Sequence, residues 1–461
     1  MERLTVVSVD SHAQMPPELW SEYLDRRYHD LLPGLQKEQK DYSFVIGLGF
    51  DQTHTNQLAA FDHDGAYEAG QWRGLWDLDV RLQEMDREGV AGEFVNNGDG
   101  RAVALFFESG NKIQAFDACR AGMQAYHRWV HDAFGSRADR LFLVGAVGTG
   151  PGDDLDASLA ELDWIAERGF RATTVPGFTA YPGDPSLLDA RWEPYWAKCA
   201  ERGLALMVHA GWGHPQGSLA ANIETAARYF ESTGGDIERF LQMLINDTMG
   251  TDFLDAPYPR QAMWQLMFSG VFDRHPELVL IMNEVRGDWV PAALDHLDEV
   301  WVRHRDELPA KRSPSEYWES NCHVCLSFVH KEEVARRHDL GVERISFGRD
   351  YPHTEGTWPN TREYLQALLV GVPEAEARGI LGENLVRFLG LDREHLAGVA
   401  ARIGYAADDV LVPDAGLDPA LAAHFDARCG FSKPFEGDLR LAQMEPLLAD
   451  DLARFATLQE T

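Results

Sequence analysis

The sequence is poor in lysine and cysteine and has no long apolar run. Basic residues number 42 against 74 acidic ones, a formal net charge of −32, so nucleic acid and anionic membrane surfaces are not expected as partners, because they repel an acidic protein. No apolar stretch reaches the roughly 18 residues that a membrane-spanning helix needs. The five cysteines lack the paired spacing of a disulfide framework or a structural zinc site. Since the N-terminus also lacks a signal-peptide pattern, these absences predict a cytoplasmic protein.

What the sequence does contain is an alternation of strand-like and helix-like segments, which is typical of βα units around a parallel sheet. The eight predicted strands are Leu4–Asp10, Gly92–Asn96, Leu141–Val147, Arg171–Val175, Leu204–Ala210, Leu278–Val285, His323–Phe328 and Arg344–Gly348. The helices predicted between them are Asp77–Glu88, Phe116–Phe134, Asp154–Arg168, Trp192–Arg202, Pro291–His304 and Thr361–Leu369. Eight strands favour a distorted (β/α)8 barrel over an open sheet, and 461 residues suffice for such a barrel with insertions.

Two insertions and a C-terminal extension complete the predicted organisation. Residues of about 16–76 follow the first strand and residues of about 212–259 follow the fifth, on the face where barrel enzymes keep their active site. The insertions hold many aromatic residues: Tyr42, Phe44, Phe50, Phe61, Tyr67, Trp72, Trp76, Trp212, Tyr229 and Phe230. These fit a lid over a bulky apolar substrate, and equally well the ordinary packing of long loops onto the barrel. We predict a barrel domain of residues 1–392 and a helical extension of residues 393–461, packed on the barrel or on a neighbouring subunit.

Residues of metal-ligand type stand at the ends of four predicted strands. The first strand ends at Asp10 and His12, the fifth at His209, the sixth at Glu284 and the eighth at Asp350. Because the C-terminal ends of barrel strands converge on one pocket, two imidazoles and three carboxylates predict a site for one divalent metal, or for two metals that share a bridging carboxylate. Each residue alone also has an ordinary explanation. Asp10 could cap a helix, His209 could be a hydrogen-bonded core histidine, and Glu284 could pair with an arginine.

Five groups of residues match a known family in order along the chain. They are Asp10-Ser11-His12 with Pro16–Trp20, Arg81–Val90, Gly270–Leu278, Gly348–His353 and Gly382–Asn384. Through them the sequence resembles the amidohydrolase-related metal enzymes, in the branch that includes aminocarboxymuconate-semialdehyde decarboxylase-like proteins, over roughly residues 4–392. The resemblance implies a distorted barrel with metal ligands at Asp10, His12, His209 and Asp350. Members of the family include hydrolases, decarboxylases of aromatic acids and a nonheme di-iron monooxygenase of diterpenoid antibiotic biosynthesis, so membership does not fix the reaction.

The chain departs from the family pattern at three points. No lysine ends a predicted strand, so the carboxylated lysine that bridges two metals in many hydrolases of the superfamily has no counterpart here. The sixth strand offers Glu284 where decarboxylase-like relatives often place a histidine. A glutamate can bridge two metals but replaces a proton-passing imidazole poorly. Arg286 and Arg349 flank two proposed ligands, and they could hold an anionic substrate group or neutralise surplus carboxylates.

The missing lysine, the glutamate of the sixth strand and the aromatic residues of the insertions favour a nonheme di-iron monooxygenase that hydroxylates an apolar, terpenoid-like substrate. In this interpretation the five strand-end residues hold two Fe ions, and Glu284 bridges them. Di-iron centres usually use more protein ligands than five, and Glu93, His214 and His353 could complete the set. An electron donor and a homo-oligomer are expected as partners.

The alternative is a hydrolase or decarboxylase with one Zn or Mn ion and a carboxylated or ester substrate. In that case Asp350 would also act as the base that deprotonates a metal-bound water, and Arg286 or Arg349 would hold a substrate carboxylate. A third interpretation is a non-catalytic barrel used for binding or assembly, which the intact ligand set disfavours.

Overall fold

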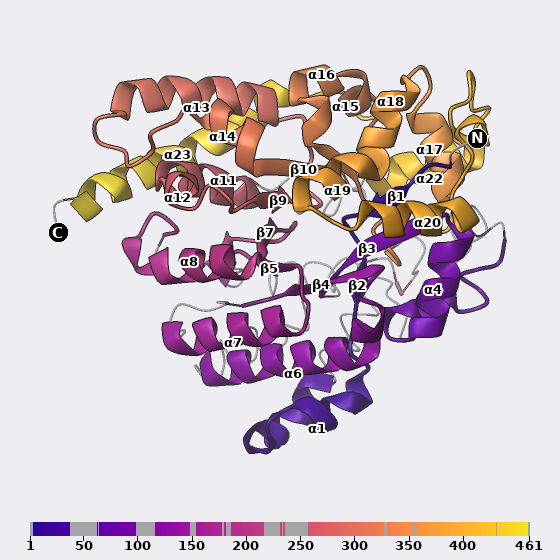
Figure 1. The fold of residues 1–461 in the computed structure, drawn as a ribbon, viewed down its shortest axis with the longest axis horizontal. Coiled ribbons are helices and arrows are strands. Elements are labelled where there is room, and N and C mark those ends of the chain that lie inside the picture. Colours follow the sequence, from indigo (N-terminus) through magenta and orange to yellow (C-terminus); the bar gives the residue numbers. More distant parts are fainter. Residues whose placement is uncertain are drawn as a thin grey trace.

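The structure, a computed structural model, describes residues 3–36, 62, 64–97, 116–147, 154–177, 179–180, 186–215, 231–232, 234–235, 257–326, 330–353, 356–429 and 431–459. Strands run through the middle of the molecule and helices surround them (Figure 1). Within these residues, no helix has both the length and the apolar character to cross a membrane.

The strands form one parallel barrel. In spatial order they are β1 (Val6–Ser8), β3 (Val90–Asn97), β4 (Leu141–Gly145), β5 (Ala172–Thr174), β7 (Ala205–Val208), β9 (Leu280–Met282), β10 (Cys322–Leu326) and β11 (Ile345–Phe347). The barrel closes where the Val9 amide donates to the Phe347 carbonyl at 3.0 Å and the Asp350 amide donates to the Asp10 carbonyl at 3.0 Å. All eight predicted strands are therefore confirmed. A short strand not predicted, β2 (His12–Ala13), extends the sheet by pairing with the end of β3.

The predicted helices are also confirmed, within a residue or two at each end. They are α4 (Leu78–Arg87), α6 (Phe116–Phe134), α7 (Leu155–Glu167), α8 (Glu193–Arg202), α13 (Val290–His304) and α17 (Thr361–Leu368). Local sequence explains the boundaries. The Asp77 and Asp154 carboxylates accept the first free amides of α4 and α7, and Gly203 ends α8 with a φ of 66°.

Other helices connect or flank these elements. They are η1 (Pro17–Leu19), α1 (Trp20–Tyr23), η2 (Arg26–Leu31), η3 (Gln71–Leu75), η5 (Gly135–Arg137), η6 (Ala190–Trp192), α11 (Tyr258–Phe268), α12 (Val271–Arg274), α14 (Pro314–Asn321), α15 (Lys331–Ala335), α16 (Arg337–Leu340), η8 (Val342–Arg344), α18 (Glu374–Arg378), η9 (Gly379–Glu383) and α19 (Asn384–Leu389).

The barrel interior is filled with apolar side chains and is closed at one end. Val7, Phe94 and Ile281 pack in one cluster with Leu396 and Val399 of α20 (Arg393–Ile403). A Cβ atom on residue 92, near the start of β3, would lie 3.0 Å from Leu396 Cδ2, so α20 covers the end where the strands begin. The opposite end, where the strands stop, is left for the candidate ligands.

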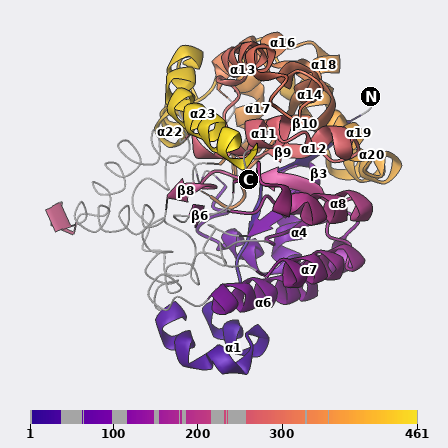
Figure 2. The same cartoon turned by 90° about the vertical axis from the view of Figure 1, so that its left-hand side faces the viewer.

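The C-terminal helices lie on the barrel of their own chain. They are α21 (Ala407–Val410), α22 (Pro419–Cys429) and α23 (Gly437–Gln459). Phe425, Met444 and Leu448 are buried in the large core cluster together with side chains of the barrel helices. In Figure 2 α23 runs beside α11 and α13, and it contacts both. The division into a domain of residues 1–392 and an extension of residues 393–461 stays a prediction.

Only parts of the two predicted insertions belong to the described residues. Tyr42, Phe44, Phe50, Phe61, Tyr229 and Phe230 lie outside them. In the first insertion η3 contacts the site end of the barrel, because the Tyr351 hydroxyl donates to the Gln71 carbonyl. At the start of the second, Trp212 is buried and donates from Nε1 to the Val175 carbonyl at 3.0 Å. For Trp212 the structure thus favours packing onto the barrel over a lid.

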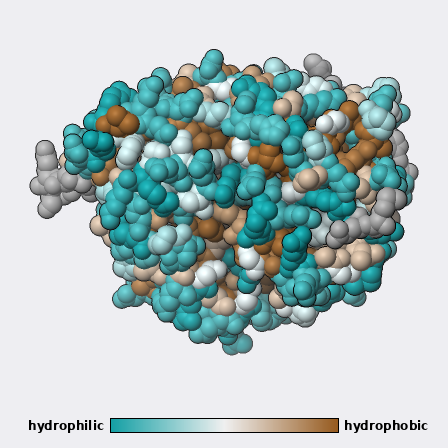
Figure 3. Space-filling model, turned by 45° about the horizontal axis from the view of Figure 1, so that its top comes forward, coloured by the Kyte–Doolittle hydropathy of each residue, from teal (hydrophilic) through white to brown (hydrophobic). Residues whose placement is uncertain are grey.

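The surface agrees with the acidic composition. The face in Figure 3 is largely hydrophilic, with hydrophobic residues in scattered spots. Among the described residues, the large hydrophobic side chains that are exposed are Val302, Val370 and Leu439, and they come from three separate helices or helix ends.

Candidate metal centre

The structure brings the five predicted ligands together at the ends of four strands. Three overlapping groups have ligand atoms within 4.8 Å of one another: Asp10 with His12 and His209, His12 with Asp350 and His353, and Asp10 with Glu284 and Asp350. Each carboxylate or imidazole follows the last residue of its strand by one to four positions. The convergence arises because the barrel curves all its C-terminal strand ends toward one axis.

Carboxylate and imidazole atoms alternate across this cluster. His12 Nε2 lies 2.9 Å from Asp350 Oδ1 and 3.5 Å from Asp10 Oδ1. His209 Nε2 lies 3.3 Å from Asp10 Oδ1, and His209 Nδ1 lies 3.0 Å from Glu284 Oε2. Asp10, His12 and Asp350 are at most 1% exposed. Their charges are therefore screened little by solvent.

The orientation of His12 is fixed by the end of β3. Its Nδ1 lies 2.9 Å from the Asn97 carbonyl oxygen. A carbonyl oxygen can only accept, so Nδ1 carries the proton and neutral His12 presents the lone pair of Nε2 to the carboxylates. That arrangement sets a lone pair against a carboxylate oxygen at 2.9 Å, which is repulsive unless a cation lies between them. The observation fits a bound metal ion.

Two asparagines hold the carboxylate of Asp10. Asn96 Nδ2 donates to Asp10 Oδ1 at 3.3 Å, and Asn283 Nδ2 donates to the same oxygen at 3.0 Å. Such partners orient a metal-ligating carboxylate. Neither asparagine is among the site residues predicted from the sequence, although each stands at or just after a strand end, and Asn283 immediately precedes Glu284. Polar residues beside ligand-type residues at strand ends were the signal that could have found them.

The backbone is unusual at two of the candidate ligands. Glu284 and Asp350 each have a φ of 51°, and among the described residues they are the non-glycine residues with positive φ. Side chains other than glycine avoid this left-handed region, at a cost of the order of 1 kcal/mol or more. Strained residues of this kind persist where the surrounding structure holds a functional geometry.

The pKa values of His12 and His209 are shifted in opposite directions by their surroundings. Burial, and then the neighbouring His353, lower the pKa of His12 below its ordinary value, although Asp350 and Asp10 oppose them. Burial also acts to lower the pKa of His209, but there the charge and hydrogen bond of Asp10 outweigh it and the net shift is upward. A neutral His12 is the form that binds a metal.

His353, named from sequence as a residue that could complete the ligand set, adjoins the cluster. Its ring stacks on that of His12 with centroids 4.1 Å apart, and its Nδ1 lies 3.0 Å from Asp350 Oδ1. The carboxylate of Asp350 therefore lies between two imidazoles.

Glu93, the second residue so named, faces arginines and not the metal cluster. Its two carboxylate oxygens lie 2.6 Å from Arg81 Nη1 and 2.7 Å from Arg349 Nη2, and all three side chains are buried. Arg349 also lies 3.4 Å from Glu88. The pKa of Glu93 is lowered although burial alone would raise it, because the two guanidinium groups outweigh that cost. For Arg349, neutralising a carboxylate is the role that the contacts support.

Two further residues predicted for the site, Arg286 and His214, are not among the clustered ligand atoms. Arg286 is buried in the loop after β9, two residues beyond Glu284. His214 lies in the two-residue strand β8 (His214–Pro215), which pairs with β6 (Thr179–Ala180) in a small separate sheet.

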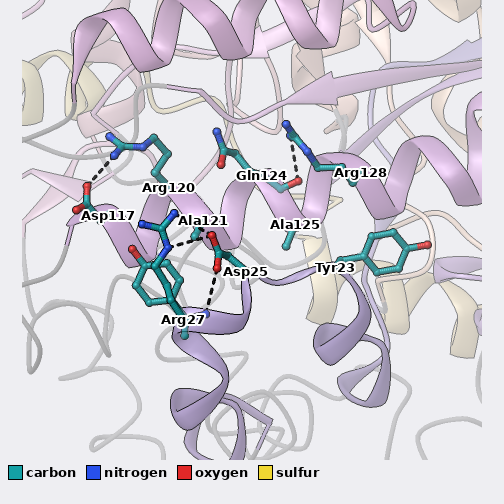
Figure 4. A pocket seen from close by; sticks show the side chains of 10 residues that line it. Tyr23, Asp25, Arg27, Asp117, Arg120, Ala121, Gln124, Ala125 and Arg128 are labelled. Carbon is teal, nitrogen blue, oxygen red and sulfur yellow. Dashed lines mark hydrogen bonds and ion pairs between the residues drawn. The ribbon is translucent and has the colours of Figure 1, made fainter.

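A hollow lies on the outer surface, between η2 and α6 and away from the metal cluster (Figure 4). It has a volume of about 280 Å³. Two ion pairs lie within its lining, with Arg27 2.8 Å from Asp25 and Arg120 2.6 Å from Asp117. Arg128, which also lines the hollow, pairs with Glu161 outside it at 2.5 Å.

Comparisons with known proteins agree with the sequence resemblance. A model of the family described as Amidohydrolase matches residues 9–391. The gamma-resorcylate decarboxylase of Rhodococcus jostii (strain RHA1) is 26% identical over 349 residues, covering 73% of this chain and 95% of that enzyme.

Solved structures share the fold. An amidohydrolase from Mycobacterium avium subsp. paratuberculosis K-10 superposes with a TM-score of 0.57 at 21% identity, over 84% of this chain and 99% of that one. A dihydroxybenzoic acid decarboxylase from Polaromonas sp. JS666, solved with manganese and the inhibitor 2-nitroresorcinol, gives a TM-score of 0.51 at 17% identity, over 86% of this chain and 99% of that one.

These findings correct the predicted reaction. The di-iron monooxygenase is wrong, because the similar curated enzyme is a decarboxylase and a structure of the same fold carries manganese. The two Fe ions and the terpenoid-like substrate, which were expected for a monooxygenase, are therefore wrong as well. An electron donor was expected only for that reaction. The physical reason is that oxygen and imidazole ligands serve iron, manganese and zinc alike. Ligand types read from sequence therefore fixed neither the metal nor the number of ions.

Proposed function

The chain belongs to the amidohydrolase family, and from that premise we propose that it is a metal-dependent decarboxylase of a small aromatic carboxylic acid. One divalent ion, Mn²⁺ or Zn²⁺, is held in this proposal by Asp10, His12, His209 and Asp350. The observation that carries it is the neutral His12 Nε2 facing the Asp350 carboxylate at 2.9 Å. Decarboxylation, and not another reaction on the same ligands, is supported by the gamma-resorcylate decarboxylase to which the chain is similar.

Glu284 has an orienting role in this proposal, which differs from the bridging role predicted from sequence. Its Oε2 lies 3.0 Å from His209 Nδ1, the ring nitrogen opposite the one that faces Asp10. Histidines that bind metals commonly donate their second N–H to a carboxylate, which fixes the ring and raises its basicity. The glutamate at this strand end thus serves one metal, and no second ion is needed to explain it.

The reaction breaks the bond between a ring carbon and its carboxylate, forms a C–H bond and releases CO₂. It consumes one proton and no oxidant. When bound, the ion supplies Lewis-acid polarisation of substrate oxygens. His353 Nδ1 and Asp350 Oδ1, 3.0 Å apart, hold the proton that the ring carbon receives. Arg286 follows Glu284 by two residues on the same loop, and its guanidinium is the group we propose to hold a substrate carboxylate.

The test uses the purified protein, stripped with a chelator and reloaded with Mn²⁺ or Zn²⁺. We expect about one ion per chain and CO₂ release from hydroxylated benzoates such as 2,6-dihydroxybenzoate, at equal rates with and without oxygen. Ester hydrolysis without CO₂ release would contradict the decarboxylase in favour of a hydrolase. Binding of about two ions per chain would contradict the mononuclear centre.

A further inference from the structure

The loop between β9 and α13, residues 283–289, carries several parts of the metal centre. Asn283 holds the Asp10 carboxylate, and Glu284 contacts His209. Arg286 follows on the same loop. Because ligands and their supporting groups must be held within a fraction of an ångström, whatever fixes this loop also fixes the site.

The barrel holds the two ends of the loop. At its start the Asn283 amide donates to the Val208 carbonyl at 2.7 Å. Further along, the Gly287 amide donates to Glu333 Oε1 at 2.6 Å. Glu333 belongs to α15, which follows β10, so the loops after two neighbouring strands are joined.

The outer side of the loop is held by the C-terminal helix. Arg440 Nε of α23 lies 3.5 Å from Asp288 Oδ2, and the two residues are 2% and 1% exposed. At the start of the same helix, a Cβ on residue 437 would lie 2.9 Å from the Asp288 carbonyl oxygen. A glycine at this position is what allows the helix to approach the loop backbone so closely.

Arg440 and α23 are themselves fixed by further contacts. Arg440 Nη2 lies 2.8 Å from Glu436. About three turns further along the helix, Asp451 accepts hydrogen bonds of 2.8 Å from Trp264 Nε1 and of 2.8 Å from Gln265 Nε2, both on α11. The guanidinium of Arg440 is thus presented to the loop by a helix that is anchored to the barrel at a separate point.

The chain just before α23 follows the neighbouring loop as well. The Lys331 amide donates to the Phe431 carbonyl at 3.1 Å, and the Arg336 guanidinium lies 3.7 Å from the centroid of the Phe435 ring. The C-terminal segment therefore contacts the connections after both β9 and β10, at the end of the barrel that carries the metal cluster.

We infer that α23 positions the loop of residues 283–289 through the Arg440–Asp288 pair, and that Arg440 is a positioning residue of the metal centre. The inference rests on the proposed function in one respect, that the cluster binds a metal. Residue 440 lies beyond the part of the chain that matches the family model, which ends at residue 391. This support for the site is thus a property of the C-terminal extension and not of the shared barrel.

The test measures the Mn²⁺ dissociation constant of the full-length protein by electron paramagnetic resonance titration, together with KM and kcat for CO₂ release. We expect Arg440→Met to weaken Mn²⁺ binding about tenfold, in the range measured for outer-shell partners of metal ligands. Arg440→Lys keeps the charge and should restore affinity to within about threefold of the wild type. The control is Arg140→Met, which removes another buried arginine, 2.8 Å from Asp86 at the end of the barrel where the strands begin, and should leave the Mn²⁺ dissociation constant unchanged.

A buried Asp288 without its arginine can unfold the protein, so the double variant Asp288→Asn with Arg440→Met accompanies the single ones. It removes both charges together, and it should fold while showing the same loss of Mn²⁺ affinity. Wild-type affinity in a folded double variant, or equal losses in Arg140→Met and Arg440→Met, would overturn the inference and leave the proposed decarboxylase intact. A wild type that binds Mn²⁺ and releases no CO₂, with Arg440→Met still about tenfold weaker, would support the inference while the proposed function fails.

Discussion

Two buried clusters of charged side chains meet at the same end of the barrel and differ in how their charge is balanced. In one, Glu93 lies between two guanidinium groups, at 2.6 Å from Arg81 and 2.7 Å from Arg349. In the other, Asp350 lies between two imidazoles, at 2.9 Å from His12 and 3.0 Å from His353. The clusters touch, because Arg81 also donates to the Ser11 hydroxyl and to the His12 carbonyl.

The difference between the two clusters shows that a buried carboxylate at a strand end is not necessarily a metal ligand. The Glu93 cluster supplies its own cations, and nothing further is needed to hold it. The Asp350 cluster faces its carboxylates with histidines, and burial, followed by the neighbouring His353, lowers the pKa of His12. In the proposed function, a bound metal ion supplies the balancing positive charge.

The largest effect is expected from removing a carboxylate that needs the external cation. Asp350→Asn should lower CO₂ release at least about a thousandfold, because it removes both a metal ligand and a proton carrier. Metal analysis and single-turnover assays of the Mn²⁺-loaded protein check this. Glu161→Gln serves as the control at a buried carboxylate outside both clusters, on the outer helix α7, and should keep its activity.

A second substitution tests the Glu93 cluster, in which arginines of the protein itself neutralise the carboxylate. Glu93→Gln leaves two buried guanidinium groups with too little negative charge, which should cost about 3–5 kcal/mol of the free energy of unfolding. Urea unfolding measures the loss, and metal content per folded chain should stay at the wild-type level. If the Glu93→Gln protein is stable but has lost its metal, Glu93 is a metal ligand, and the two clusters do not differ in the way described.

A smaller effect is expected from the amide that orients Asp10. Asn283→Ala removes the 3.0 Å hydrogen bond to that carboxylate and should weaken Mn²⁺ binding about 10- to 100-fold. The matched control is Asn321→Ala, because Asn321 is also buried and its amide donates to the Leu278 carbonyl at 2.8 Å, away from the cluster. Asn321→Ala should lower stability only, and equal Mn²⁺ dissociation constants in the two variants would contradict the role of Asn283.

The smallest effect concerns a second carboxylate that is neutralised by side chains of the protein itself, on the outer helices. Burial acts to raise the pKa of Glu161, but hydrogen bonds and charges from His127 and Arg128 outweigh it and lower the pKa from 4.5 to about 2. A folded-state pKa below the unfolded one stabilises the protein above about pH 4.5, and this stabilisation is lost as the pH falls toward 2. Glu161→Gln should therefore cost about 1–2 kcal/mol at pH 7.

The pH dependence provides the check on Glu161. The difference in urea midpoint between wild type and Glu161→Gln should narrow as the pH is lowered from about 5 to about 3, while the Mn²⁺ dissociation constant at pH 7 stays equal in both proteins. A difference that is constant over this range would show that the ionised carboxylate does not contribute.

The sequence determined the barrel and the places where chemistry could occur. Apolar runs of strand length are local patterns, and the structure confirms all eight, with His12, His209, Glu284 and Asp350 beyond the ends of four of them. The same patterns led to the wrong reaction, because oxygen and nitrogen ligand types suit several metals and either one ion or two.

The partners of each buried charged side chain follow from the tertiary structure and not from local sequence. Asp10 and Asn283 are 273 positions apart in sequence, and Arg349 and Glu93 are 256 apart, so no local pattern relates them. Closure of the barrel brings Glu93 into contact with two arginines and His12 Nε2 into contact with Asp350. Packing of α23 on the barrel brings Arg440 close to Asp288. Strand formation follows from short-range periodicity, whereas the electrostatic balance of a buried site depends on distances that the folded chain alone creates.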